Sequence, residues 1–132
     1  MGYAGFMRFE PGELAWLDAT EEVEIETATP GGSPHRTIIW VVVDGDEAFV
    51  RSVNGPTARW YREAVANPAV TIHSRRRVQP AHALPARAEA AADAASIERT
   101  SDALRRKYAR DPALGTMLKP EIFETTLRLA PA

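Results

Sequence analysis

The chain has 132 residues, of which 45% are hydrophobic and 26% are charged, as expected for one globular domain. Its formal net charge of −2 gives no overall field that favours nucleic acid or an anionic membrane, so any anion site has to be built locally. The absence of cysteine excludes disulfides, zinc–thiolate centres and a cysteine nucleophile.

The start of the chain does not have the pattern of a leader. Residues 1–17 contain Arg8 and Glu10 and lack the apolar stretch of a signal peptide. The longest apolar run, residues 38–43, is far too short to span a bilayer. We therefore expect a single domain over residues 1–132 of a cytoplasmic protein with no membrane partner.

The first half of the chain predicts a helix followed by three strands. Residues 11–17 place two leucines three positions apart, as on one face of a short helix. Residues 23–26 alternate apolar and acidic side chains, which indicates a strand with one solvated face. Residues 37–43 are dense in β-branched side chains and predict a central strand. A turn at residues 44–46 then returns the chain as an antiparallel strand over residues 48–53.

The middle of the chain predicts a helix and two further strands. Thr57 is a suitable N-cap for a helix that Pro68 ends. Residues 69–73 form the next short strand. Residues 78–89 predict a long strand, which Pro80 and Pro85 confine to an edge or a bulge.

The last part predicts a helix and a final strand. Asp93 caps a helix that runs to about residue 109, and residues 122–129 alternate apolar and polar side chains as a strand does. The total is about six strands and three helices, with mostly hairpin links. This order favours a mainly β (α+β) fold, a small antiparallel barrel with helices packed around it.

One constellation suits the binding of a flat ring system with an anionic tail. Arg36, Arg51 and Arg59 offer planar forks of donors that match phosphate oxygens, and each hydrogen bond to a charged group contributes roughly 1.5–3 kcal/mol. The helix start at Thr57 adds backbone N–H groups, and Trp40 supplies an apolar wall. The alternative is that the arginines only solvate a strand end and a helix.

The order of these features resembles the pyridoxamine-phosphate-oxidase-like, FMN-binding split-barrel superfamily, which includes deazaflavin-dependent reductases. Lys107-Tyr108 and the closing Thr126 to Leu129 are similar to a small bacterial branch whose function is largely unassigned. The earlier matching segments are Glu24 to Thr27, Gly32, Arg36 to Trp40, Asp44-Gly45, Phe49 to Ser52, Arg59 and Asn67 to Val70.

The resemblance implies a six-stranded antiparallel split β-barrel that holds its flavin at a homodimer interface. Residues of the second strand would face the flavin, and the following strand and helix start would meet its phosphate. Ala58 departs from the pattern, because some members have a basic residue there. The implied cofactor-binding residues are Arg36, Thr37, Ile38, Trp40, Arg51, Ser52, Thr57 and Arg59.

The implied function is a flavin-dependent oxidoreductase acting on a small organic substrate. The flavin would carry the redox chemistry, so no catalytic side chain is named. FMN is preferred to a deazaflavin, whose polyanionic tail needs a basic groove that only Arg75 to Arg77 could supply. Two alternatives stay open: a non-catalytic barrel that carries flavin or haem, and a ligand-free dimeric interaction module.

Two other kinds of site are weaker. His35, His73 and His82 show no metal-ligand spacing, so no metal site is expected. The three arginines at residues 75–77 have no aromatic stacking platform beside them, which argues against nucleic acid. They fit either an exposed strand end or contact with a cofactor tail.

Overall fold

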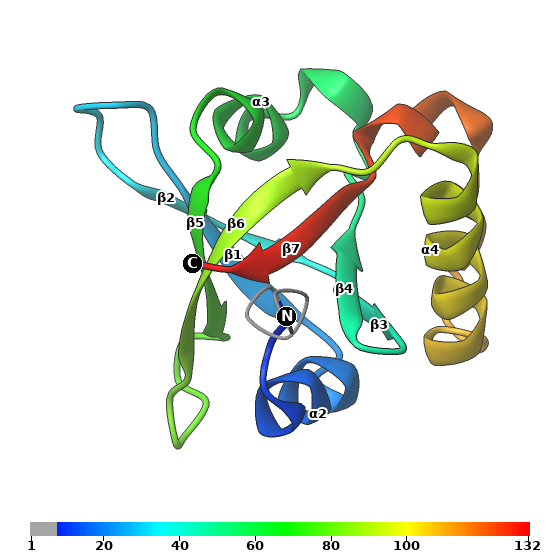
Figure 1. The fold of residues 1–132 in the computed structure, drawn as a ribbon, viewed down its shortest axis with the longest axis horizontal. Coiled ribbons are helices and arrows are strands. Elements are labelled where there is room, and N and C mark those ends of the chain that lie inside the picture. The colour runs from blue at the N-terminus through cyan, green and yellow to red at the C-terminus, as the bar shows by residue number, and fades with distance from the viewer. Residues whose placement is uncertain (1–7) are drawn as a thin grey trace, which may run out of the picture.

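The computed structural model describes residues 8–132 and contains one antiparallel sheet that curls into a half-open barrel (Figure 1). The expectation that the chain starts without a signal peptide falls partly on residues 1–7, which lie outside the described residues. The sheet has seven strands in the order β2-β1-β5-β6-β7-β4-β3. They are β1 (Val23–Thr27), β2 (His35–Ile39), β3 (Val42–Asp44), β4 (Glu47–Val50), β5 (Ala69–Ser74), β6 (Ala83–Ala90) and β7 (Leu127–Pro131).

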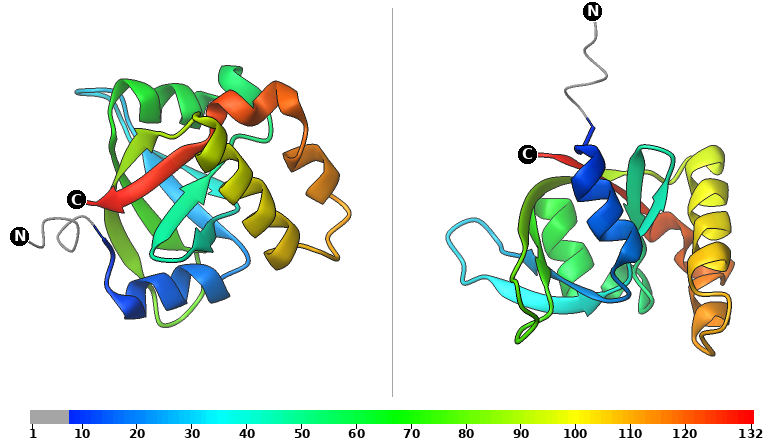
Figure 2. Two further views of the ribbon diagram at one scale, coloured as in Figure 1. Left: turned by 45° about the vertical axis from the view of Figure 1, so that its right-hand side comes forward. Right: turned by 90° about the horizontal axis from the view of Figure 1, so that it is seen from below.

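Helices surround the curled sheet on three sides (Figures 1 and 2). In the view of Figure 1, α2 lies below the barrel, α3 above it, and α4 beside the β3–β4 hairpin. Within residues 8–132 no helix has the length and apolar character needed to cross a membrane. The helices are α2 (Pro11–Ala19), α3 (Arg59–Ala66), α4 (Ala94–Lys107) and α5 (Leu114–Met117), with 3₁₀ helices η1 (Gly55–Thr57) and η2 (Pro120–Thr125).

Two apolar clusters hold these layers together. The barrel interior is filled from β1, β4, β5, β6 and β7, and Leu17 of α2 and Trp60 of α3 close its two ends. The second cluster lies outside the barrel, where Phe49 packs against Leu104 and Tyr108 at the α4 side. The outer face of β4 is therefore as buried as its inner face, which explains why its sequence is apolar on both sides.

The run predicted as one strand over residues 37–43 is divided in two, so the expectation of six strands is wrong. β2 pairs with β1 and β3 pairs with β4, at the two opposite ends of the sheet. The chain crosses between these ends at Trp40 and Val41. Val41 is fully buried in the barrel core, whereas Trp40 lies on the α4 side. At this crossing the two end strands of the sheet, β2 and β3, are joined by the peptide chain and not by a ladder of hydrogen bonds.

Two other predicted boundaries are corrected. Residues 120–125 form a 3₁₀ helix, and β7 begins only at Leu127. The hydroxyl of Thr125 donates to the carbonyl of Ile122 at 2.7 Å and that of Thr126 to Phe123 at 2.8 Å, which favours local turns over a strand. The strand predicted from residue 78 begins at Ala83, after an exposed loop.

The predicted helix after Asp93 is confirmed, and the side chain of Asp93 accepts a hydrogen bond from the backbone of Ser96 at 3.0 Å. The helix near Thr57 is also present. Thr57 is not its N-cap, because Thr57 ends η1 and Ala58 occupies the cap position of α3 without a side-chain hydrogen bond.

Candidate functional site

An apolar hollow opens beside β2 where the barrel is split, and we call it the cleft. Its volume is about 360 Å³, within the range of small-molecule sites. Ile38 and Val53 at this cleft remain 46% and 44% exposed, which is unusual for large apolar side chains. The cleft is lined by Glu22, Thr37, Ile38, Ile39, Trp40, Arg51, Val53, Asn54, Trp60, Asp111, Ala113 and Met117.

The indole of Trp40 is fixed by a ring stack. It lies 3.8 Å from the ring of Tyr108 with an interplanar angle of 5°. The hydroxyl of Tyr108 donates to the backbone carbonyl of Glu21 at 2.6 Å, and burial raises the pKa of Tyr108. Trp40 therefore presents a pre-positioned aromatic surface to the cleft, at little entropic cost to a ligand.

Arg51 contributes to the cleft from a buried position. Its side chain is only 2% exposed, and burial lowers its pKa to about 10. Four hydrogen bonds hold it: Nε to the Thr126 hydroxyl at 2.9 Å, Nη1 to the Ser101 hydroxyl at 3.1 Å and the Met117 carbonyl at 3.0 Å, and Nη2 to the Ile97 carbonyl at 3.1 Å. Since a guanidinium has five N–H groups, only one remains for a ligand.

Ser52 and Thr57 serve the loop between β4 and α3. The buried hydroxyl of Ser52 donates to the Gly55 carbonyl at 2.8 Å, and Gly55 has a φ of +77° that favours glycine. Thr57 is exposed, and its carbonyl accepts a hydrogen bond from Arg62 at 3.2 Å. Neither hydroxyl lines the cleft.

Arg36 and Arg59 lie at two other hollows. Arg36 lies beside the 75–82 loop, with Nε 2.8 Å from Oε1 of Glu24. Arg59 is exposed at the start of α3, in a shallow hollow shared with Arg62 and Glu63. The expectation that Arg36, Arg51 and Arg59 gather around one anion is therefore not met within a single chain. Thr37, Ile38, Trp40 and Arg51 do share the cleft.

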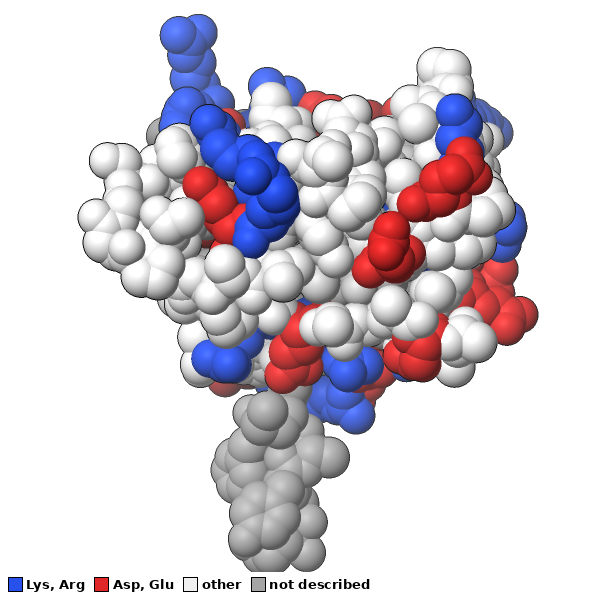
Figure 3. All heavy atoms as spheres, turned by 90° about the horizontal axis from the view of Figure 1, so that it is seen from above, with Lys and Arg blue, Asp and Glu red and all other residues white. Residues whose placement is uncertain are grey.

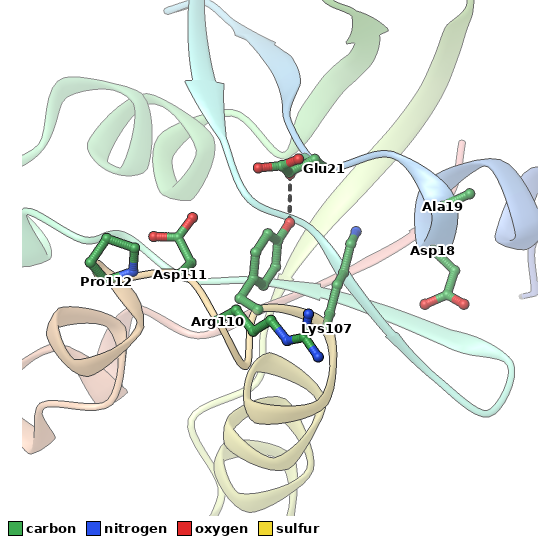
Figure 4. Close-up of a pocket in the computed structure, with 8 residues that line it drawn as sticks. Asp18, Ala19, Glu21, Lys107, Arg110, Asp111 and Pro112 are labelled. Carbon is green, nitrogen blue, oxygen red and sulfur yellow. Dashed lines mark hydrogen bonds between the residues drawn. The ribbon is translucent and has the colours of Figure 1, made fainter.

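A second hollow, of about 520 Å³, lies between the ends of α2 and α4 (Figure 4). Its Lys107 is held by three backbone carbonyls, of Leu17 at 2.9 Å, Thr20 at 2.8 Å and Val41 at 2.6 Å. Burial lowers the pKa of Lys107 to about 8. Because all three N–H groups already have acceptors, we assign Lys107 to joining α2, the β2–β3 crossing and α4.

Eight of the twelve residues that line the cleft are not among the predicted cofactor-binding residues. Val53, Trp60 and Met117 come from the loop after β4, from α3 and from α5, and none was named for the site. An apolar side chain at a site carries no chemical signature. Only the 44% exposure of Val53, which the sequence does not reveal, distinguishes it from a core residue.

The curled sheet, its crossing and its helices have the split-barrel fold of several solved structures. HutZ, the haem storage protein of Vibrio cholerae, has the same fold, with a TM-score of 0.65 and 18% identity over 96% of this chain and 92% of that chain. A candidate pyridoxamine 5′-phosphate oxidase of Listeria innocua gives a TM-score of 0.62 and 15% identity, over 92% and 90%. A candidate 5-nitroimidazole resistance protein of Bacteroides thetaiotaomicron gives 0.63 and 13%, over 95% and 81%.

Residues 13–129 match the family described as "Uncharacterized protein conserved in bacteria (DUF2255)", and the chain belongs to that family. No curated protein matches it in sequence. The likeness to the solved structures, at such low identity, establishes the fold alone. Among residues 8–132, no group of three His, Cys, Asp or Glu side chains is placed to hold a metal ion.

Proposed function

We propose that this protein binds the ring system of a flavin, FMN or a deazaflavin, in the cleft and acts as an oxidoreductase on a small organic substrate. The single observation that carries the proposal is the apolar, partly open cleft with Trp40 held in its wall. A planar ring gains by leaving water for such a surface and by stacking on an indole. The flavin supplies the redox chemistry, and the protein supplies orientation and a dry pocket.

The proposal includes a homodimer. Ile38 and Val53 expose a large part of their surface at the cleft. A second copy that covered these side chains would remove apolar area from water and enclose the bound ring. The resemblance to the split-barrel superfamily likewise implies a homodimer that holds its flavin at the interface.

The lining of the cleft fits the ring better than the phosphate. Among the described residues that line it, Arg51 is the only cation and keeps one free N–H, while Glu22 and Asp111 line the same space. One N–H suits a ring carbonyl oxygen, and a phosphate group requires several donors. We therefore assign Arg51 to the ring end of the ligand.

A haem carrier is the second candidate. HutZ, of which 92% is covered, is a haem storage protein, and Met117 is among the residues that line the cleft. Methionine is one of the side chains that ligate haem iron. The three histidines lie outside the cleft, which argues against a haem site there. A ligand-free interaction module is the outcome left if neither cofactor binds.

The visible absorption spectrum of the purified protein, before and after reconstitution with FMN, a deazaflavin and haem, separates these functions. We expect flavin bands at about one equivalent per chain, and turnover of the bound flavin by a reduced nicotinamide or deazaflavin donor. A Soret band would support the haem carrier. A featureless spectrum after all three reconstitutions would refute both.

A further inference from the structure

We propose that four arginines at the end of β5 bind a multiply charged oxyanion, such as a phosphate ester or a polycarboxylate. Arg75, Arg76 and Arg77 line a hollow of about 290 Å³ together with Arg36 of β2, and we call it the basic hollow. His73 and His82 also line it. Guanidinium groups that converge on a concave surface suit an oxyanion, because each offers paired donors.

The charges in this hollow are not balanced. Arg75 pairs with Glu22 at 2.9 Å, and Arg36 and Arg76 share the single carboxylate of Glu24, at 2.8 and 3.6 Å. Arg77 makes no ion pair with another described residue. Four guanidiniums thus face two carboxylates, and His73 has its own partner in Glu26 at 2.8 Å. This local excess of positive charge contrasts with the net charge of −2 of the chain.

The loop that carries the arginines has a defined shape. The backbone N–H of Val78 donates to the Arg75 carbonyl at 3.0 Å, which closes a tight turn. Within it, Arg77 has a φ of +76°, a conformation that is strained for any residue other than glycine. Strain of this kind is found more often at ligand sites than elsewhere.

Both ends of the loop are fixed to the body of the protein. Two hydrogen bonds join Ser74 and His82: the Ser74 N–H donates to the His82 carbonyl at 3.0 Å, and the His82 N–H donates to the Ser74 hydroxyl at 3.0 Å. The ring of His82 stacks on Trp16 of α2 at 4.9 Å. The backbone that carries the arginines is therefore fixed before an anion arrives, which reduces the entropic cost of binding.

The basic hollow adjoins the cleft. Glu22, which lines the cleft, is the ion-pair partner of Arg75, and Thr37 of the cleft follows Arg36 directly in β2. A ligand with its ring in the cleft can direct an anionic chain toward the basic hollow. That extension rests on the proposed function, whereas anion binding by the hollow does not.

The test is calorimetric titration of the full-length protein with inorganic pyrophosphate and with citrate at low salt. We expect both anions to bind. The double variant Arg75→Gln/Arg77→Gln should weaken binding by about ten-fold or more, the size of one lost charge-assisted contact. The control is Arg105→Gln, since Arg105 is an exposed arginine that pairs with Asp102 on α4. Absence of binding, or equal weakening in the control, would overturn the proposal, as would tighter binding of a single-stranded oligonucleotide than of pyrophosphate.

FMN and riboflavin separate this inference from the proposed function. They share the ring, and only FMN carries the phosphate. We expect FMN to bind more tightly than riboflavin, and the double variant to remove that difference. If pyrophosphate binds while neither flavin does, the proposed function fails and the basic hollow stands. If both flavins bind equally and pyrophosphate does not bind, the basic hollow fails and the cleft stands.

Discussion

The guanidinium of Arg51 is a buried charge without a carboxylate among its hydrogen-bond partners. Its four bonds reach α4 through Ile97 and Ser101, the end of α5 through Met117, and the start of β7 through Thr126. The ring of Phe123 lies 4.8 Å from the guanidinium carbon and adds a cation–π contact. One side chain thus joins α4 and α5 to the paired ends of β4 and β7.

Substituting Arg51 should therefore affect stability before it affects a ligand. Arg51→Met leaves the Met117 carbonyl and the hydroxyls of Ser101 and Thr126 without this buried donor, and each unsatisfied buried group costs about 1–3 kcal/mol. We expect urea unfolding to show a loss of about 3 kcal/mol or more. Arg59→Gln, at an exposed position, is the control and should change stability by less than about 0.5 kcal/mol. A similarly small effect for both variants would contradict the structural role of Arg51.

Lys107 makes the free energy of unfolding depend on pH in the alkaline range. Burial lowers its pKa to about 8 in the folded protein, from its ordinary value of 10.5. Between these values the unfolded chain binds more protons than the folded one, so the contribution of Lys107 to the free energy of unfolding rises with pH. We expect the pH slope of stability in this window to be smaller in Lys107→Met than in the wild type, as measured by urea unfolding. Identical slopes would show that the ammonium is not buried in this way.

At the scale of elements, α4 is joined to the β3–β4 hairpin by ion pairs. Arg99 bonds Oδ2 of Asp44 at 2.6 Å and also contacts Glu47. The hydrogen bond from Arg99 lowers the pKa of Asp44. Burial raises the pKa of Glu47, but hydrogen bonds from Arg99 and Arg8 outweigh it and the pKa is lowered. Both carboxylates therefore stabilise the fold only while they are ionised.

Acidic pH should weaken these ion pairs between α4 and the β3–β4 hairpin. Because the folded pKa values are depressed, the stabilisation is present above the unfolded pKa values and is lost as pH falls through the folded ones. We expect the stability of Arg99→Met to decline less steeply than that of the wild type between about pH 5 and pH 3. Arg105→Gln, at an exposed pair within α4, should retain the wild-type slope. A steeper decline in Arg99→Met would contradict the assigned pKa directions.

Helix α4 was predictable from the sequence, because its cap at Asp93 and its apolar stripe are local signals. The division of residues 37–43 into two strands was not predictable, because nothing within that run indicates that its two halves join opposite ends of the sheet. The same distinction applies to the site. Thr37, Ile38 and Trp40 line one cleft, as neighbours in sequence can, and their cofactor-binding role stays a prediction. The separation of Arg36, Arg51 and Arg59 depends on how the barrel curls.

At the scale of the whole molecule, the formal net charge is only −2, so no strong overall field is expected. On the face shown in Figure 3, Lys and Arg alternate with Asp and Glu, and broad uncharged areas separate them. The proposed contact between two copies is therefore expected to be apolar and to centre on the cleft. Ile38 and Val53 are the exposed apolar side chains there, while Val65, at 59% exposure, belongs to α3 outside the cleft.

This arrangement predicts the effect of single charges on assembly. Ile38→Asp would place a carboxylate in the apolar contact and should convert the dimer to a monomer, because an unpaired buried charge is costly. Val65→Asp should leave the dimer intact. Sedimentation equilibrium gives the mass of each variant. A monomeric wild type, or a dimer that survives Ile38→Asp, would contradict the proposed interface.

The most direct test of the central claim is a titration of FMN into the wild type, Val53→Arg and Val65→Arg, followed by the change in flavin fluorescence. Val53 lines the cleft, so its arginine variant fills the space that the ring would occupy, and Val65→Arg adds the same charge elsewhere. We expect saturation near one flavin per chain for the wild type and Val65→Arg, with binding weakened at least about ten-fold in Val53→Arg. Equal binding by all three proteins, or none by the wild type, would contradict a flavin site in the cleft.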